Sequence, residues 1–188
     1  YRGDSQDLKM DVYLPKTNTD TLEKRPFILL IHGGGFTGGA REWMKYHAVE
    51  LSKRGFVVAT MSYRLGYDRA VFGSIQKAVY RAQQDANTAL RYIASKKEKL
   101  RIDTSWFFIG GSSAGAVTSL STSYASQEEW SQIAPQFESD LGPLESSNTS
   151  TNEIFKIQGI YNFMGAILPV VFNSGKLIPT ISFHGDLD

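Results

Sequence analysis

Short apolar runs and amphipathic stretches alternate along most of the chain. Near its start, Leu8, Met10, Val12 and Leu14 occupy alternate positions, which is the period of a half-buried strand, and Pro15 ends the pattern. Further strands are predicted at residues 27–31, 56–61, 106–109, 154–161 and 178–183. The first of these is wholly apolar, as expected of a strand that is covered on both faces.

Three segments between the strands have the periodicity of helices. Trp43, His47 and Leu51 recur at helical spacing before Gly55, a residue type common just past a helix end, and this spacing places His47 on a buried stripe. Residues 114–125 predict a second helix. A long amphipathic helix lies between these two, and its apolar face consists of Ile75, Val79, Ala82, Ala86, Ala89, Leu90 and Ile93.

Strands that alternate with helices imply parallel pairing through right-handed crossovers. We therefore predict an α/β fold in one domain over residues 1–188, with a doubly wound, mostly parallel sheet and helices on both faces. In such sheets the active site lies outside the carboxyl ends of the strands. The polar stretch 127–153 is long for a connection. It is either a lid-like excursion over the sheet edge or site mouth, or a surface loop with one short helix.

Composition excludes several classes of function. The 20 basic residues nearly cancel the 19 acidic ones, and no basic patch with interleaved aromatics occurs, so no nucleic-acid partner is expected. Without cysteine the chain has no disulfides and no thiolate sites. The longest apolar stretch, residues 163–172, is too short to span a bilayer. Metal-ligand spacings such as H-E-x-x-H do not occur.

The candidate nucleophile is Ser113, in the G-x-S-x-G pattern of residues 111–115. A catalytic serine needs exposure, a base, and donors for the oxyanion that it creates. Small flanking residues between an apolar strand and a helix allow the sharp turn that exposes the hydroxyl. The neighbouring Ser112 is a rival, but it occupies the wrong place in the pattern. A tight turn without catalytic function is the alternative.

A second glycine-rich element, His32-Gly33-Gly34-Gly35-Phe36, follows an apolar strand. Three consecutive glycines are costly unless the backbone approaches another group closely or adopts positive φ. The backbone amides of Gly34 and Gly35, together with that of Ala114, are predicted to form an oxyanion hole. A phosphate cradle is disfavoured, because no G-K-[ST] end and no G-x-G-x-x-G spacing is present. A flexible loop is the remaining alternative.

These two motifs resemble those of the α/β-hydrolase esterases with an HGGG oxyanion loop, in the hormone-sensitive-lipase-like and carboxylesterase-like branches. Matching pieces extend from about residue 8 to the end of the chain. The similar stretches are residues 10–15, Ser62-Tyr63-Arg64-Leu65, Gln84-Asp85-Ala86 before Ala89-Leu90, and Ile102-Asp103. The resemblance implies ester hydrolysis through an acyl-enzyme, without a cofactor or a metal.

The last residues, His184-Gly185-Asp186-Leu187-Asp188, resemble the H-G-x-x-D stretch with which this fold presents the triad carboxylate. By that spacing Asp188 is the acid and Asp186 the runner-up, and the acid would hold a histidine in one tautomer. Turn chemistry after a strand is the alternative reading of the two aspartates.

The triad histidine should follow the acid, because the chain order in this fold is Ser, Asp/Glu, His. No residue follows Asp188, so the printed chain lacks a general base and is expected to be inactive or nearly so. Of the three histidines, His32 is expected to brace its own loop, His47 to lie in the core and His184 to order the acid's turn. Either a C-terminal part is absent, which the abrupt end favours, or the protein is a decayed hydrolase kept for binding. A signal peptide before Tyr1, and with it a secreted or periplasmic protein, stays open.

Tyr63 and Arg64 end a strand on the same side as the motifs. We expect Arg64 to pair with a carboxylate and fix its loop, and Asp85 on the long helix is the candidate partner. The main hypothesis is a serine hydrolase acting on small-molecule or carbohydrate-linked carboxylic esters. A serine peptidase of the prolyl-oligopeptidase type and a non-catalytic binding module are the alternatives, and the oligomeric state stays open.

Overall fold

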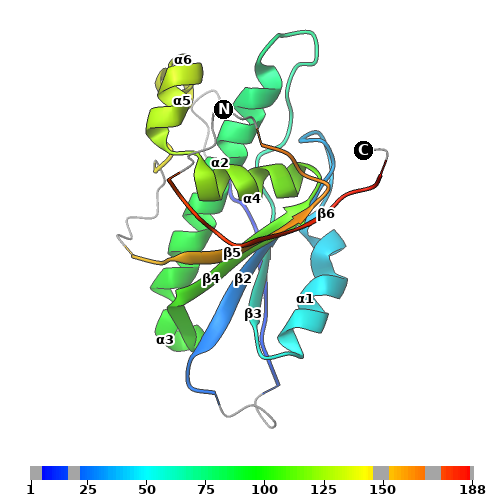
Figure 1. Ribbon diagram of the computed structural model, residues 1–188, viewed down its shortest axis with the longest axis vertical. Helices are drawn as coiled ribbons and strands as arrows, with labels where there is room; N and C mark the ends of the chain where they lie inside the picture. The colour runs from blue at the N-terminus through cyan, green and yellow to red at the C-terminus, as the bar shows by residue number, and fades with distance from the viewer. Residues whose placement is uncertain (1–5, 17–21, 146–152, 168–174, 187–188) are drawn as a thin grey trace.

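The computed structural model describes residues 6–16, 22–145, 153–167 and 175–186. Within these residues the strands form a six-stranded sheet in the order β1-β3-β2-β4-β5-β6 (Figure 1). Strand β1 is antiparallel to β3, and every other pair in the sheet is parallel. This arrangement confirms the predicted mostly parallel sheet. The strands are β1 Met10–Tyr13, β2 Arg25–Ile31, β3 Val57–Met61, β4 Ile102–Ser112, β5 Ile157–Phe163 and β6 Thr180–Phe183.

Helices cover both faces of the sheet, also as predicted. Figure 1 shows α1 to the right of the sheet, with α2 and α3 to the left. Helices α2 and α4 pack on each other, and α4 also packs on β4 and β5. The helical elements are the 3-10 turn η1 Arg41–Met44, α1 Lys45–Ser52, α2 Ser74–Ser95, α3 Lys97–Leu100, α4 Ala114–Tyr124, α5 Gln127–Ile133 and α6 Gln136–Leu141.

Strand β2 shows why its sequence is apolar at every position. Phe27, Leu29 and Ile31 belong to the large core cluster under α2 and α4. Ile28 and Leu30 point the other way, into a smaller cluster with Met44 of η1 and Ala48 of α1. Both faces are therefore buried, and no polar position alternates with the apolar ones.

The first predicted helix has the wrong phase. Its buried residues are Met44, Ala48 and Ser52, one position later than the predicted stripe, while Trp43 is 64% exposed and His47 is also exposed. The prediction of a core histidine at position 47 is therefore wrong. Trp43 lies in the 3-10 turn, whose side chains follow a different period from those of α1, and the small Ala48 and Ser52 let α1 approach the sheet.

Two strand boundaries also differ from the prediction. Strand β4 is longer than residues 106–109 and includes Gly110 and Gly111, because both pair with β2 and with β5. Strand β5 begins at Ile157, and Ile154 is 87% exposed. Apolar character alone places a strand but does not mark its ends.

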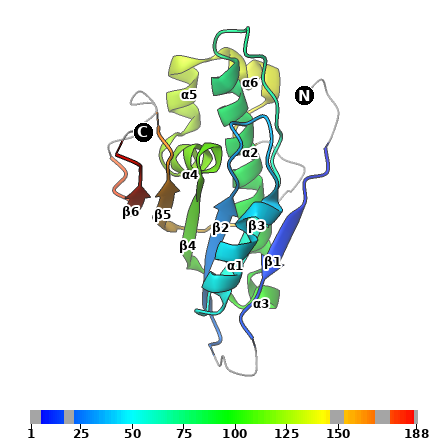
Figure 2. The same ribbon diagram turned by 90° about the vertical axis from the view of Figure 1, so that its right-hand side faces the viewer.

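The polar stretch after α4 contains two short helices in the residues that the structure describes. Trp130 of α5 is 1% exposed and packs edge-on against Tyr80 of α2, in a second core cluster. Its indole Nε1 donates to Oε1 of Gln83 (2.7 Å). Figure 2 shows α5 and α6 beside the upper part of α2. Among the described residues, no helix combines the length and apolar character needed to cross a membrane.

Candidate active site

Ser113 lies at the sharp turn between β4 and α4. Its backbone has φ 51° and ψ −118°, and its side chain makes no capping hydrogen bond to α4. Positive φ is unusual for a residue with a Cβ and is tolerated where the surroundings fix it, often at functional sites. Here the N–H of Ser113 donates to the carbonyl of Phe163 at the end of β5 (2.8 Å), and its C=O accepts from Val117. The rival Ser112 remains in the ladder of β4.

The glycines on either side of the turn are required by close backbone packing. A Cβ added to Gly111 would lie 2.5 Å from the carbonyl oxygen of Ile31, and one added to Gly115 would meet the same oxygen. The first turn of α4 therefore rests directly on the end of β2. No side chain larger than hydrogen fits at either position without moving the backbone.

The glycine-rich loop after β2 passes directly against this turn. A Cβ on Gly33 would lie 2.9 Å from the carbonyl oxygen of Ser112 and 3.2 Å from Cβ of Ser113. Gly34 and Gly35 both have positive φ, at 116° and 59°. Their conformation is one that glycine adopts without strain.

Backbone N–H groups near the Ser113 turn are available to a ligand. Within the described parts of the chain, the N–H groups of Gly34 and Gly35 make no hydrogen bond. Ala114 is the first residue of α4, where a helix leaves N–H groups without an intrahelical acceptor. Donors of this kind beside a hydroxyl are what an oxyanion hole requires. Their assignment to that role stays a prediction.

The ends of β4, β5 and β6 are joined by backbone hydrogen bonds at the same edge of the sheet. Besides the bond from Ser113 to Phe163, the N–H of Met164 donates to the carbonyl of Phe183 (2.9 Å). The residues after β6 begin with His184 and continue to Asp186, whose side chain is exposed. The predicted acid, Asp188, lies outside the described residues. The Ser113 turn follows β4 and the start of the predicted acid turn follows β6, so the two lie at the same edge of the sheet with β5 between them.

The family model described as BD-FAE matches residues 10–188. The chain belongs to the BD-FAE family. It is 26% identical over 168 residues to a probable isoprenylcysteine alpha-carbonyl methylesterase of Arabidopsis thaliana, covering 88% of the chain and 31% of that protein. It is 29% identical over 134 residues to gut esterase 1 of Caenorhabditis elegans, covering 66% of the chain and 22% of that protein. The chain thus spans a third or less of these curated relatives.

Solved structures of Thermogutta terrifontis esterase 2 have the same fold. The butyrate-bound form superimposes with a TM-score of 0.65 at 21% identity, over 88% of the chain and 51% of that structure. The form phosphonylated by cyclosarin gives a TM-score of 0.67 at 20% identity, over 96% of the chain and 67% of that structure. The fold of this BD-FAE domain is that of the α/β-hydrolases.

His32 braces the glycine-rich loop of the BD-FAE domain, in agreement with the sequence expectation. Its Nδ1 lies 2.7 Å from the carbonyl oxygen of Gly33, so Nδ1 carries the proton. The ring stacks on Tyr63 at 4.5 Å between centroids, and the Tyr63 hydroxyl donates to the carbonyl of His32 (3.0 Å). Burial lowers the pKa of His32 and raises that of Tyr63. Both side chains are therefore neutral structural groups near neutral pH.

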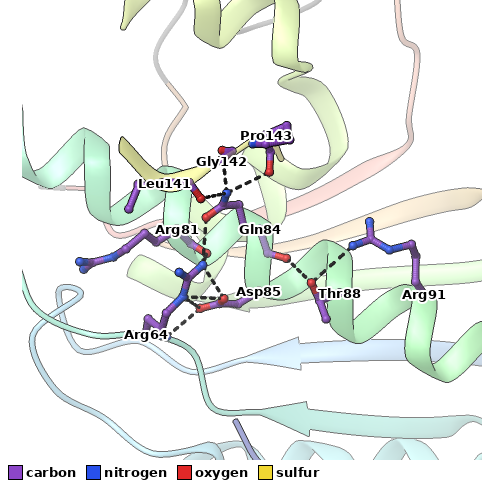
Figure 3. Close-up of polar contacts among 9 residues, drawn as sticks. All are labelled: Arg64, Arg81, Gln84, Asp85, Thr88, Arg91, Leu141, Gly142 and Pro143. Carbon is purple, nitrogen blue, oxygen red and sulfur yellow. Dashed lines mark hydrogen bonds and ion pairs between the residues drawn. The ribbon is translucent and has the colours of Figure 1, made fainter. Parts of the chain in front are cut away.

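The predicted pairing of Arg64 with Asp85 is confirmed. Nε of Arg64 donates to Oδ1 of Asp85 and its backbone N–H to Oδ2, both at 2.8 Å, as Figure 3 shows. Burial acts to raise the pKa of Asp85, and the contacts with Arg64 act to lower it. The pair fixes the loop after β3 to helix α2.

Asn162 lies near the carboxyl end of β5, at the edge of the candidate site, and was not predicted from the sequence. It is 5% exposed, and its Oδ1 accepts from the N–H of Gly165 (2.9 Å). Its Nδ2 lies 3.1 Å from Ser182 Oγ and 3.3 Å from His184 Nε2. A lone polar residue near the carboxyl end of an apolar strand was the only signal that pointed to it.

A cavity of about 350 Å³ lies beside the glycine-rich loop. Ser113 does not line it; His32, Ser62 and Tyr63 do, with the segment of residues 6–9. It therefore sits at the carboxyl ends of β2 and β3, the edge where α/β folds bind ligands.

Proposed function

We propose that this domain is the catalytic part of a serine hydrolase that cleaves carboxylic esters through an acyl-enzyme. The observation that carries the proposal is Ser113 at positive φ between β4 and α4, with the backbone of Gly33 packed against it. Among the described residues, the Ser113 hydroxyl has no hydrogen-bond partner, so it is not committed to a structural role.

In the proposed reaction, Oγ of Ser113 attacks the ester carbonyl carbon while its proton passes to a histidine. The N–H groups of Gly34, Gly35 and Ala114 stabilise the negative oxygen of the tetrahedral intermediate. Its collapse breaks the bond to the alcohol, which leaves with the proton from the histidine. Water then attacks the acyl-enzyme by the same route and releases the acid and free Ser113.

The base is assigned to none of the three histidines of this chain. His32 is held by Gly33 and Tyr63, His184 contacts Asn162, and His47 lies on α1. In the proposal, Asp188 orients the histidine, with Asp186 as the second candidate. Activity is to be measured on the natural full-length protein, because the chain spans a third or less of these curated relatives.

The relatives support the ester as the substrate class. Their names describe a methylesterase and an esterase, and the similar solved structures are of an esterase, one of them with butyrate bound. We extend this to small-molecule or carbohydrate-linked esters. None of the described contacts favours a peptide substrate.

The test compares Ser113→Ala with Ser112→Ala in the full-length protein, using nitrophenyl esters and a matched set of peptide amides. We expect Ser113→Ala to lower kcat by roughly 10³-fold or more, since the nucleophile is lost. Ser112→Ala should retain activity within a few-fold. If Ser112→Ala lost ester hydrolysis while Ser113→Ala kept it, the assignment of Ser113 as the nucleophile would be overturned. Cleavage of the peptides without the esters would favour the peptidase.

A further inference from the structure

A series of partly buried polar contacts connects the end of α6 with the glycine-rich loop, and Figure 3 shows its central part. It begins at Gln84 of α2, which is 2% exposed. Nε2 of Gln84 lies within 3.1 Å of three successive carbonyl oxygens, those of Leu141, Gly142 and Pro143. The last carbonyls of a helix lack intrahelical donors, so Gln84 satisfies groups that α6 cannot satisfy itself.

The other end of the Gln84 amide holds Arg64. Oε1 of Gln84 accepts from Nη2 of Arg64 (2.9 Å), while Asp85 binds both the Nε and the backbone N–H of the same arginine. Side chain and main chain at position 64 are thus both fixed to α2. The neighbouring Arg81 adds a contact from its guanidinium to the carbonyl of Gly66.

The loop that Arg64 fixes holds the glycine run at both of its ends. At the first end, Tyr63 donates to the carbonyl of His32 (3.0 Å) and stacks on its ring. At the other end, the N–H of Gly66 donates to the carbonyl of Phe36 (2.6 Å). Residues 33–35 have no side chains of their own to anchor them. These two ends therefore help to hold them in place, together with the hydrogen bonds that the carbonyls of Gly33 and Gly34 accept from His32, Thr37 and Gly38.

We propose that Gln84 and Arg64 are positioning residues for the backbone donors of Gly34 and Gly35, and that the end of α6 acts on these donors through them. The inference rests on the proposed function. A small displacement of such donors weakens their stabilisation of the oxyanion more than it weakens substrate binding, because the negative charge develops only during the reaction. We call the contacts from the end of α6 through Gln84, Arg64 and Tyr63 to the glycine run the relay. Its loss should therefore lower kcat and leave KM nearly unchanged.

The test uses Gln84→Leu, Tyr63→Phe and the double variant in the full-length protein. Gln84→Leu keeps the size of the side chain and removes its donors and acceptor. We expect each single variant to lower kcat by about 10-fold, the scale of one lost hydrogen bond, with KM within about two-fold. If the two act along one path, the double variant should resemble the slower single variant.

Gln83→Leu is the matched control. Gln83 is the neighbouring buried glutamine of α2, and it binds Trp130 and the carbonyl of Ala125 instead of Arg64. It should lower the melting temperature as Gln84→Leu does but leave kcat unchanged. Equal kcat values for the two glutamine variants, or multiplicative effects in the double variant, would overturn the relay.

Two further results keep this test separate from that of the proposed function. Activity retained by Ser113→Ala contradicts the nucleophile, whereas a fully active Gln84→Leu contradicts only the relay. If Gln84→Leu does not fold, Tyr63→Phe alone decides, since it removes one hydroxyl and keeps the ring on His32. A Tyr63→Phe enzyme with the kcat of the wild type would then refute the proposal.

Discussion

The side-chain amide of Asn162 donates to Nε2 of His184, with 3.3 Å between the two nitrogens. The direction follows from the rest of the amide, because Oδ1 already accepts from the N–H of Gly165 and the NH₂ group must face His184. One buried residue thus joins the turn after β5 to the residues that follow β6. Those residues lead into the predicted acid turn.

Replacing Asn162 with leucine should destabilise the protein by about 1–3 kcal/mol, because buried groups of Gly165 lose their partner. Urea unfolding of the full-length protein measures this change. Asn87→Leu is the control, since Asn87 makes an exposed contact with Glu145, and its effect should stay within about 0.5 kcal/mol. Equal unfolding midpoints for the two variants would show that the Asn162 contacts do not hold the turn.

Gly115→Ala should be strongly destabilising, although alanine is usually better than glycine in a helix by about 1 kcal/mol. The added Cβ would meet the carbonyl oxygen of Ile31 and lie 2.7 Å from that of His32. We expect a loss of roughly 3 kcal/mol or more, in the range of severe overpacking. Gly38→Ala is the control, because nothing lies within 4 Å of a Cβ there. Unfolding curves that coincide for both variants would contradict the close contact of α4 with β2.

Acid should destabilise the fold partly through His32. Burial lowers the pKa of His32 below 6.5, the ordinary value of a histidine side chain, so the unfolded chain takes up this proton at higher pH than the folded chain does. The contribution is present above pH 6.5 and is lost as the pH falls through 6.5 toward the lower pKa of the folded state.

This effect is measured as the slope of unfolding free energy against pH in wild type and in His32→Asn. The variant cannot titrate at position 32, so its slope between pH 5 and 7 should be shallower. The other histidines are present in both proteins and cancel in the comparison. Parallel curves over this range would mean that His32 titrates equally in both states.

The sequence was sufficient for the elements whose signal is local. Residues 27–31 are apolar at every position because both faces of β2 are buried, and this predicts a central strand. The glycines around Ser113 predict a sharp turn, since only glycine allows the backbone approach that the structure shows at Gly111 and Gly115. The partner of Arg64 was also predictable, because a guanidinium at a strand end needs a carboxylate within reach.

Other features depend on tertiary contacts that the sequence does not display. The phase of α1 is set by the 3-10 turn before it, and the aromatic Trp43 gives a misleading start to the stripe. Asn162 shows its importance only once Gly165 and His184 lie beside it. Gln84 likewise gains a role only because the end of α6 folds back onto α2.

The most direct test of the account is to label the full-length protein with a fluorophosphonate and map the adduct by tandem mass spectrometry. Residues 112 and 113 are both serine, so fragment ions must separate them. The account predicts an adduct on Ser113 that persists in Ser112→Ala and disappears in Ser113→Ala. An adduct on Ser112, or ester hydrolysis that continues in Ser113→Ala, would contradict it.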